Sequence, residues 1–97
     1  MIVRRSIHRL KHGKGKESVA LVQETLGAMA VTFRVYTSQI GAPFGTLAVE
    51  MESESMADLE KADAEFNASP EGTAFYEKWH QVTEPDTGHA EIWGLEE

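Results

Sequence analysis

Five polar side chains fall at alternating positions of segments that have the pattern of β-strands: Arg4, His8, Arg34, Tyr36 and Glu50. An arginine can hold a substrate carboxylate or enolate, a histidine or glutamate can accept a proton, and a tyrosine can donate a hydrogen bond. We therefore predict His8, Arg34 and Tyr36 as catalytic residues and Arg4 and Glu50 as ligand-binding residues. The same side chains would also suit an ion-paired network that fixes how two subunits pack, so both interpretations stay open.

Two tryptophans and a second histidine complete the predicted ligand-binding set. Trp79 and His80 are neighbours in a helical segment, where they could line the mouth of a pocket, and Trp93 lies in the last predicted strand. A pair such as Trp79 and His80 also fits a half-buried helix face that binds nothing. The sequence alone does not decide between these two roles.

Other motifs indicate neither a metal nor a cofactor. His8 and His12 are four residues apart, but they sit on a strand and its turn rather than on one helical face. The segment 13–18 joins a strand to a helix as phosphate loops do, yet it lacks the GxxxxGK[ST] spacing, and Glu17 would repel a phosphate. We predict an ordinary turn there. The chain has no cysteine, which excludes disulfides and thiolate chemistry.

Charge is unevenly distributed along the chain. Residues 1–16 hold six of the nine Lys and Arg residues and no acid, whereas residues 50–97 hold fourteen of the sixteen acids. We expect the basic first strand to pair with acidic strands in the sheet, and we predict no nucleic-acid partner. No apolar run approaches the roughly 18 residues that span a bilayer. The sequence predicts one soluble domain over residues 1–97, located in the cytoplasm, with no membrane partner.

Hydrophobic periodicity gives the elements that position these side chains. The expected elements are strand 2–10, helix 18–26, strands 31–37 and 46–52, helix 56–66 and strand 90–95. A further helix begins at Ser69-Pro70 and ends before Pro85. This order predicts an α+β fold of the ferredoxin-like β-α-β-β-α-β plan, with a four-stranded antiparallel sheet and helices on one face.

The alternation of side chains divides each strand into two faces. The apolar sets that should face the helices are Val31, Phe33 and Val35, and Leu47, Val49 and Met51. The first strand is not cleanly apolar on either face, so its orientation stays open. For the predicted site we place Arg4 and His8 on the uncovered face, with an apolar margin of Ile2, Leu10, Ala48, Trp93 and Leu95. Such a mixed face suits a partner subunit around a small polar cavity.

Short motifs resemble one superfamily. Residues 12–16, His-Gly-Lys-Gly-Lys before a helix, resemble the "KPGK" segment of the dimeric α+β barrel superfamily. The loop 40–46, the helix start 54–61 and the closing Glu-Ile-Trp at 91–93 resemble its NIPSNAP-like branch. The resemblance covers most of the chain and implies a homodimer whose open sheet faces pack into a barrel. The superfamily includes cofactor-independent monooxygenases, haem-degrading monooxygenases and many proteins of unknown role.

The resemblance does not bring the haem site to this chain. Haem-degrading members use an Asn, a Trp and a His around the porphyrin, but the only Asn here is Asn67, at a helix end. Adjacent Trp79 and His80 would point about 100° apart on a helix. No cofactor is therefore predicted.

The resemblance leaves three functions open. The first is a NIPSNAP-like protein that binds a small organic molecule in the barrel cavity. The second is a cofactor-independent monooxygenase of the antibiotic-biosynthesis type. It would hold its substrate between the open sheet face and the second helix, with Arg34 and Tyr36 stabilising charge and His8 as base. The third is a structural or assembly module without catalysis.

Overall fold

An antiparallel sheet with the strand order β2-β3-β1-β4 forms the base of the structure, a computed structural model that describes residues 1–96. The strands are β1 (Ile2–Arg9), β2 (Phe33–Thr37), β3 (Thr46–Ser53) and β4 (His89–Gly94). The helices are α1 (Gly15–Gly27), α2 (Met56–Asn67) and α3 (Pro70–Val82). The predicted ferredoxin-like α+β fold is confirmed, with α3 present between α2 and β4.

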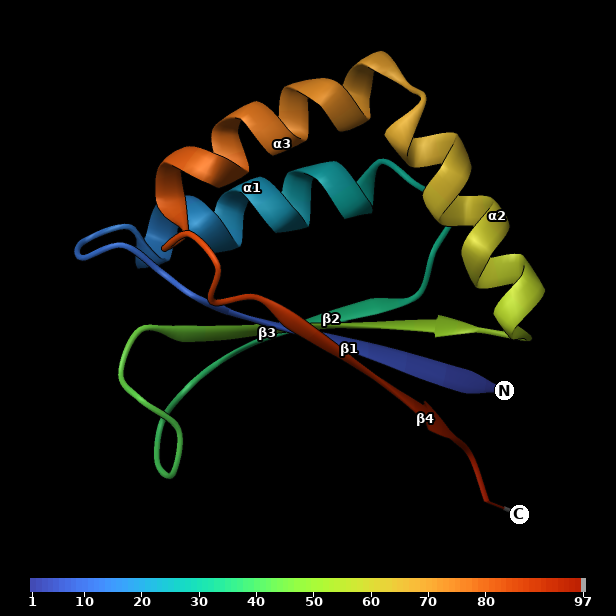
Figure 1. The fold of residues 1–97 in the computed structure, drawn as a ribbon, viewed down its shortest axis with the longest axis horizontal. Helices are drawn as coiled ribbons and strands as arrows, with labels where there is room; N and C mark the ends of the chain where they lie inside the picture. Colours follow the sequence, from blue (N-terminus) through green and yellow to red (C-terminus); the bar gives the residue numbers. More distant parts are fainter. Residues whose placement is uncertain (97) are drawn as a thin grey trace.

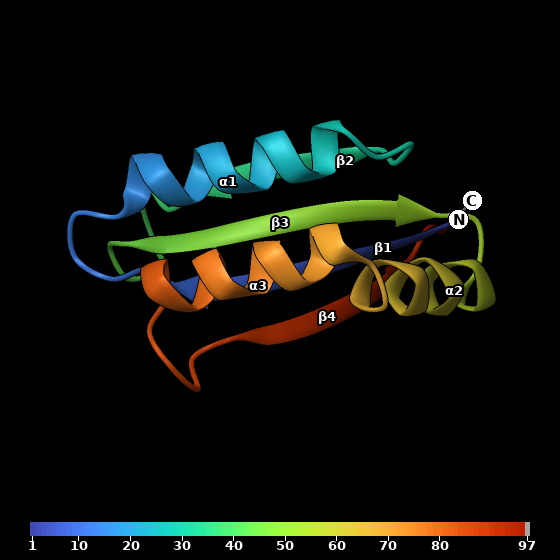
Figure 2. The same cartoon turned by 90° about the horizontal axis from the view of Figure 1, so that it is seen from above.

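All three helices lie on one side of the sheet, and the opposite side is uncovered (Figure 1). Seen from above, α1 and α3 run along the sheet, α2 lies at one end, and β4 forms an outer edge (Figure 2). The long loop between β2 and β3 projects to the uncovered side (Figure 1). None of the helices in residues 1–96 has the length and apolar character needed to cross a membrane.

Serine caps start two of the helices. The Ser55 hydroxyl accepts a hydrogen bond from the Asp58 backbone N–H at 3.2 Å, and the Ser69 hydroxyl accepts one from the Gly72 N–H at 3.0 Å. Each cap satisfies a donor that the helix leaves free, and Pro70 occupies the first helical turn, where no N–H is needed. The predicted N-terminal ends of α2 and α3 are confirmed.

The predicted boundaries of the other elements either agree with the observed ones or differ from them by at most three residues. The largest difference is in α1, which begins at Gly15 rather than Ser18. Ser18 is fully buried, and its hydroxyl donates to the Lys14 carbonyl at 2.6 Å, as a residue inside the first turn can do. The strand expected from Val31 begins at Phe33.

The hydrophobic core lies between the sheet and the helices. Its buried members are Val22, Leu47, Trp79 and Val82, with Val35 and Val49 packed against them. Val35 and Val49 are paired across β2 and β3, so the apolar sides of these strands share one face. The predicted orientation of both strands is therefore confirmed.

The orientation of β1, which the sequence left open, is clear in the structure, and the placement of Arg4 and His8 on the uncovered face is wrong. Arg5 is paired with Glu50 of β3 and Glu91 of β4, and its side chain bonds to Glu50 on the uncovered side. Because side chains alternate along a strand, Arg4 and His8 point toward the helices, as do Ile2 and Leu10. The covered face accepts these two polar residues because Asp63 of α2 pairs with Arg4 and Trp79 of α3 packs against His8.

Candidate functional site

The sheet separates the predicted site residues into two groups. Arg4, His8 and Trp79 line a cavity between the sheet and the helices. The group on the uncovered side comprises Arg34, Tyr36, Glu50 and Trp93. His80 belongs to neither group, because it is exposed on α3, with its ring 6.3 Å from that of Tyr76. The predicted substrate position between the open face and α2 is also wrong, since α2 lies on the other side of the sheet.

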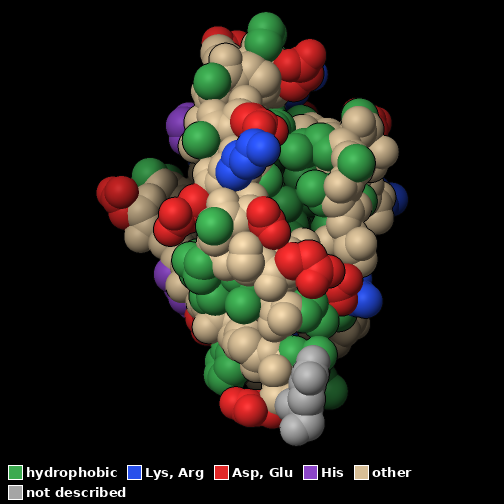
Figure 3. Space-filling view, turned by 90° about the vertical axis from the view of Figure 1, so that its right-hand side faces the viewer, with side chains coloured by type: hydrophobic (Ala, Val, Ile, Leu, Met, Phe, Trp, Pro, Cys, Tyr) green, Lys and Arg blue, Asp and Glu red, His purple; other side chains and the backbone are tan. Residues whose placement is uncertain are grey.

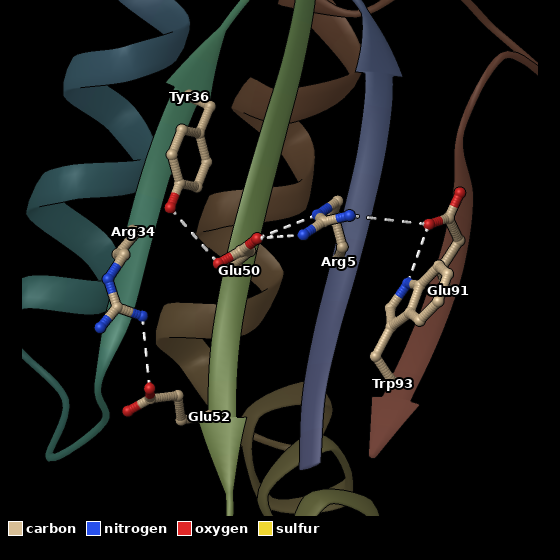
Figure 4. A network of polar contacts seen from close by, with 7 residues as sticks. All are labelled: Arg5, Arg34, Tyr36, Glu50, Glu52, Glu91 and Trp93. Carbon is tan, nitrogen blue, oxygen red and sulfur yellow. Dashed lines mark hydrogen bonds and ion pairs between the residues drawn. The ribbon is translucent and has the colours of Figure 1, made fainter. Parts of the chain in front are cut away.

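Glu50 is the centre of the polar network on the uncovered face (Figure 4). Its carboxylate accepts hydrogen bonds from Arg5 Nε and Nη2 at 2.9 and 2.6 Å, and one from the Tyr36 hydroxyl at 3.4 Å. The hydrogen bond to Glu50 raises the pKa of the Arg5 guanidinium. Sequence reasoning missed Arg5, which the register places at the middle of this face.

The network extends to both edges of the sheet. Arg5 Nη1 lies 3.9 Å from Glu91, whose carboxylate also accepts the Trp93 indole N–H at 3.0 Å. Arg34 donates to Glu52 at 3.3 Å (Figure 4). Both predicted charge stabilisers, Arg34 and Tyr36, are therefore engaged with carboxylates of this chain. The arrangement matches the alternative prediction of an ion-paired network.

The cavity on the covered side, which we call the inner cavity, has a volume of about 310 Å³. This volume is within the range of small-molecule sites. Its lining residues come from every element except β2: Arg4, Ser6, His8, Val22, Thr25, Leu26, Met29, Val49, Met51, Ala62, Asp63, Phe66, Asn67, Phe75, Tyr76, Trp79 and Ala90.

Aromatic side chains of α2 and α3 form much of the wall of the inner cavity. Phe75 and Trp79 are stacked, with ring centroids 5.4 Å apart and planes at 20°. Phe66 contacts Phe75 in a T-shaped arrangement at 5.8 Å. Such walls offer flat apolar surfaces to an aromatic molecule.

A charged pair lies at the Arg4 end of the cavity. Arg4 Nη1 is 2.5 Å from Asp63 Oδ2, and Nη2 donates to the sulfur of Met51 at 3.4 Å. The Nε–H of Arg4 is buried and has no hydrogen-bond partner among residues 1–96. Burial, together with the nearby Asp63 charge, raises the pKa of Tyr76. The Tyr76 hydroxyl therefore stays protonated as a potential donor.

His8 lies further along β1 in the same cavity. Burial, reinforced by the charge of His89, lowers the pKa of His8 from its ordinary value of 6.5, so the ring is neutral at pH 7. The backbone at Gly88 passes close to the imidazole and leaves no room for a side chain there, since a Cβ at that position would lie 2.6 Å from Nδ1. A neutral, positioned imidazole can accept a proton.

A second hollow adjoins the inner cavity. This entrance groove, of about 790 Å³, lies between α1 with its following turn and α2–α3. Five residues line both spaces: Thr25, Met29, Ala62, Phe66 and Phe75. The surface seen from the α2 end is hollowed, with hydrophobic side chains inside and charged ones around the hollow (Figure 3). The groove and the inner cavity are therefore adjacent spaces that meet at these five side chains.

Asp63 and Tyr76 are cavity residues that the sequence analysis missed. Asp63 is four residues after buried Leu59 and three before Phe66, so it is an acid on the apolar stripe of α2. Tyr76 is three residues before Trp79 on α3. The signal available in the sequence was Asp63, a charged residue at a position of α2 where the helical pattern calls for an apolar one. Within residues 1–96, no cluster of three or more His, Cys, Asp or Glu residues is arranged to hold a metal ion.

Comparison with known proteins identifies the class of fold. No family model and no curated protein matches the sequence. Among solved structures, an uncharacterised NIPSNAP domain protein from Burkholderia xenovorans has a TM-score of 0.83 at 16% identity, over 99% of this chain and 95% of that one. A NIPSNAP family protein of unknown function from Agrobacterium tumefaciens C58 has a TM-score of 0.79 at 19% identity, over 96% and 86% of the two chains.

The similarity extends to enzymes. An antibiotic biosynthesis monooxygenase has a TM-score of 0.73 at 13% identity, over 100% of both chains. The chain therefore has the fold that NIPSNAP family proteins and antibiotic biosynthesis monooxygenases share, and the predicted resemblance is confirmed at that level. Identities this low show the fold alone.

Proposed function

We propose that this chain binds a small aromatic molecule in the inner cavity. The observation that carries the proposal is the Arg4 end of this space, where a charged pair lies next to aromatic walls. Arg4 has five N–H donors, yet within the described chain its Nε–H has no partner and Nη2 meets only a sulfur, which is a weak acceptor. A ligand oxygen would satisfy these donors after a small movement of the guanidinium.

Calorimetric titration with 2-naphthol tests this proposal. A ligand of this size should bind one per chain with a Kd of about 1 mM or tighter. Arg4→Gln should weaken binding at least fivefold, because it removes the charged donors. Arg9→Gln is the matched control, since Arg9 is exposed at the end of the same strand and lies outside the inner cavity. Absence of saturable binding by the unmodified protein would refute the proposal.

We further propose that two copies associate through their uncovered sheet faces. The support is the composition of this face, on which Trp93 is 57% exposed and Tyr36 46% exposed beside charges that are already paired within one chain. Paired charges cost less to bury than free ones, and exposed aromatic rings gain from burial. A second copy presents the same face, with its charges paired in the same way and the same exposed aromatic rings.

A second candidate function is a cofactor-independent monooxygenase, and the neutral His8 in the inner cavity favours it. In the proposed step His8 removes a proton from an activated methylene of an anthrone-type substrate. The methylene carbon is then oxidised by O₂. One oxygen atom becomes the new carbonyl and the other leaves as water, so that R₂CH₂ + O₂ gives R₂C=O + H₂O.

Oxygen uptake with an anthrone substrate distinguishes catalysis from binding alone. The enzymatic function predicts uptake above the uncatalysed rate, which His8→Ala should abolish while 2-naphthol still binds. Uptake that is unchanged in His8→Ala, or absent in the unmodified protein, would contradict it. A reaction in the inner cavity gives no role to Arg34 and Tyr36, the predicted charge stabilisers, because they lie across the sheet from His8.

A further inference from the structure

We infer that the entrance groove selects aromatic ligands that are uncharged and excludes anions. The inference rests on the proposed binding function and names the class of ligand. The evidence is the charge of the groove, its contact with the inner cavity and the pairing of charges inside that cavity.

The charged side chains that line the groove are predominantly acidic. They are Glu24 of α1, Glu65 of α2, Glu71 of α3 and Lys78 of α3. All four residues are exposed, and none of them belongs to an ion pair within residues 1–96. The three carboxylates therefore outnumber the one ammonium around the groove, and they repel an approaching anion.

The interior does not reverse this preference. The Arg4 charge is already balanced by Asp63 at 2.5 Å, so a ligand carboxylate would meet one positive and one negative group. Its transfer from water into an apolar space would also lose solvation that this pair does not replace. A phenol or carbonyl group avoids both costs and, after the small movement of the guanidinium, accepts from the unpartnered Nε–H of Arg4.

The side of the groove that adjoins the inner cavity is mainly apolar. Met29, Phe66 and Phe75 line both the groove and the inner cavity, so an aromatic ligand makes apolar contacts in either space. A ligand that enters the inner cavity by way of the groove passes the carboxylates before it reaches Arg4. Selection by charge at this point acts on every molecule that uses the groove.

The experiment compares 2-naphthol with 2-naphthoate by titration at pH 7 and low ionic strength. The two probes share a ring system and differ in charge. The inference predicts that 2-naphthoate binds at least tenfold more weakly and that added salt reduces the difference. The triple variant Glu24→Gln, Glu65→Gln, Glu71→Gln should reduce it as well.

A second triple variant controls for total charge. Glu60→Gln, Glu77→Gln and Glu84→Gln remove three exposed acids outside the groove and change the net charge equally. This variant should keep the discrimination. Equal binding of the two probes, or equal loss of discrimination in both triple variants, would overturn the inference while leaving the binding proposal in place. Failure of both probes to bind would overturn the two together.

Discussion

The rings of His8 and Trp79 are in T-shaped contact, with centroids 5.0 Å apart and planes at 85°. This contact joins β1 to α3 and fixes the face of the first strand that turns toward the helices. With His8 turned toward the helices, Arg34 and Tyr36 lie on the opposite side of the sheet from it. The structure therefore has a covered, partly apolar cavity and an uncovered, ion-paired face, and different experiments address each.

The burial of His8 predicts a pH dependence of stability. The pKa of His8 is lowered in the folded protein, whereas the unfolded chain keeps the ordinary value of 6.5. Between these two values the unfolded chain binds more protons, so the free energy of unfolding falls as the pH decreases through 6.5 toward the folded pKa.

Urea denaturation between pH 5 and 8 measures this effect. His8→Gln should flatten the dependence in that range, and His80→Gln, which changes an exposed histidine outside the cavity, is the matched control. A pH dependence in His8→Gln equal to that of the unmodified protein would rule out this account of His8.

The ion pair of Arg4 and Asp63 should be energetically coupled. Asp63→Ala leaves the half-buried guanidinium without its partner and should cost about 1–2 kcal/mol of unfolding free energy. In a double-mutant cycle, Arg4→Met with Asp63→Ala should give a coupling energy of about 1 kcal/mol. The more exposed pair of Arg34 and Glu52 should give less than about 0.5 kcal/mol. Equal coupling in the two pairs would count against a special role for Arg4.

Gly72 permits the close approach of α3 to the end of α2. A Cβ at this position would lie 2.0 Å from the Phe66 carbonyl oxygen, so backbone has to move. Gly72→Ala should destabilise the protein by about 3 kcal/mol, as measured by chemical denaturation. Gly27→Ala provides the comparison, because a Cβ there would meet no atom within 4 Å outside the neighbouring backbone of its own helix, and it should be neutral or slightly stabilising. Similar stabilities of the two variants would contradict this packing.

Charge reversal at Arg5 should break the proposed dimer. Arg5→Glu would place a third carboxylate between Glu50 and Glu91 on the uncovered face. Light scattering at micromolar concentration should show a dimer for the unmodified chain and a monomer for Arg5→Glu. Lys61→Glu makes the same charge change at an exposed position of α2, on the other side of the sheet, and this variant should remain dimeric. A monomeric unmodified protein would refute association through this face.

The sequence predicted the order of elements because apolar spacing and the serine caps are local signals. Strands β2 and β3 could be oriented for the same reason, since each has one clearly apolar face. Strand β1 could not, because Ile2 and Leu10 favour one face while Val3 and Ile7 favour the other. The residues that decide its orientation, Asp63 and Trp79, are distant in the chain and meet β1 only in the folded protein. The inner cavity was missed for the same reason.

The two tryptophans allow a direct test of where a ligand binds. Trp79 is 6% exposed and lines the inner cavity, whereas Trp93 is 57% exposed on the opposite face. Each gives one indole N–H signal in a ¹⁵N-correlated NMR spectrum. Titration with 2-naphthol should shift the Trp79 signal and leave that of Trp93 in place. A shift of Trp93 alone, or of neither signal, would contradict binding in the inner cavity.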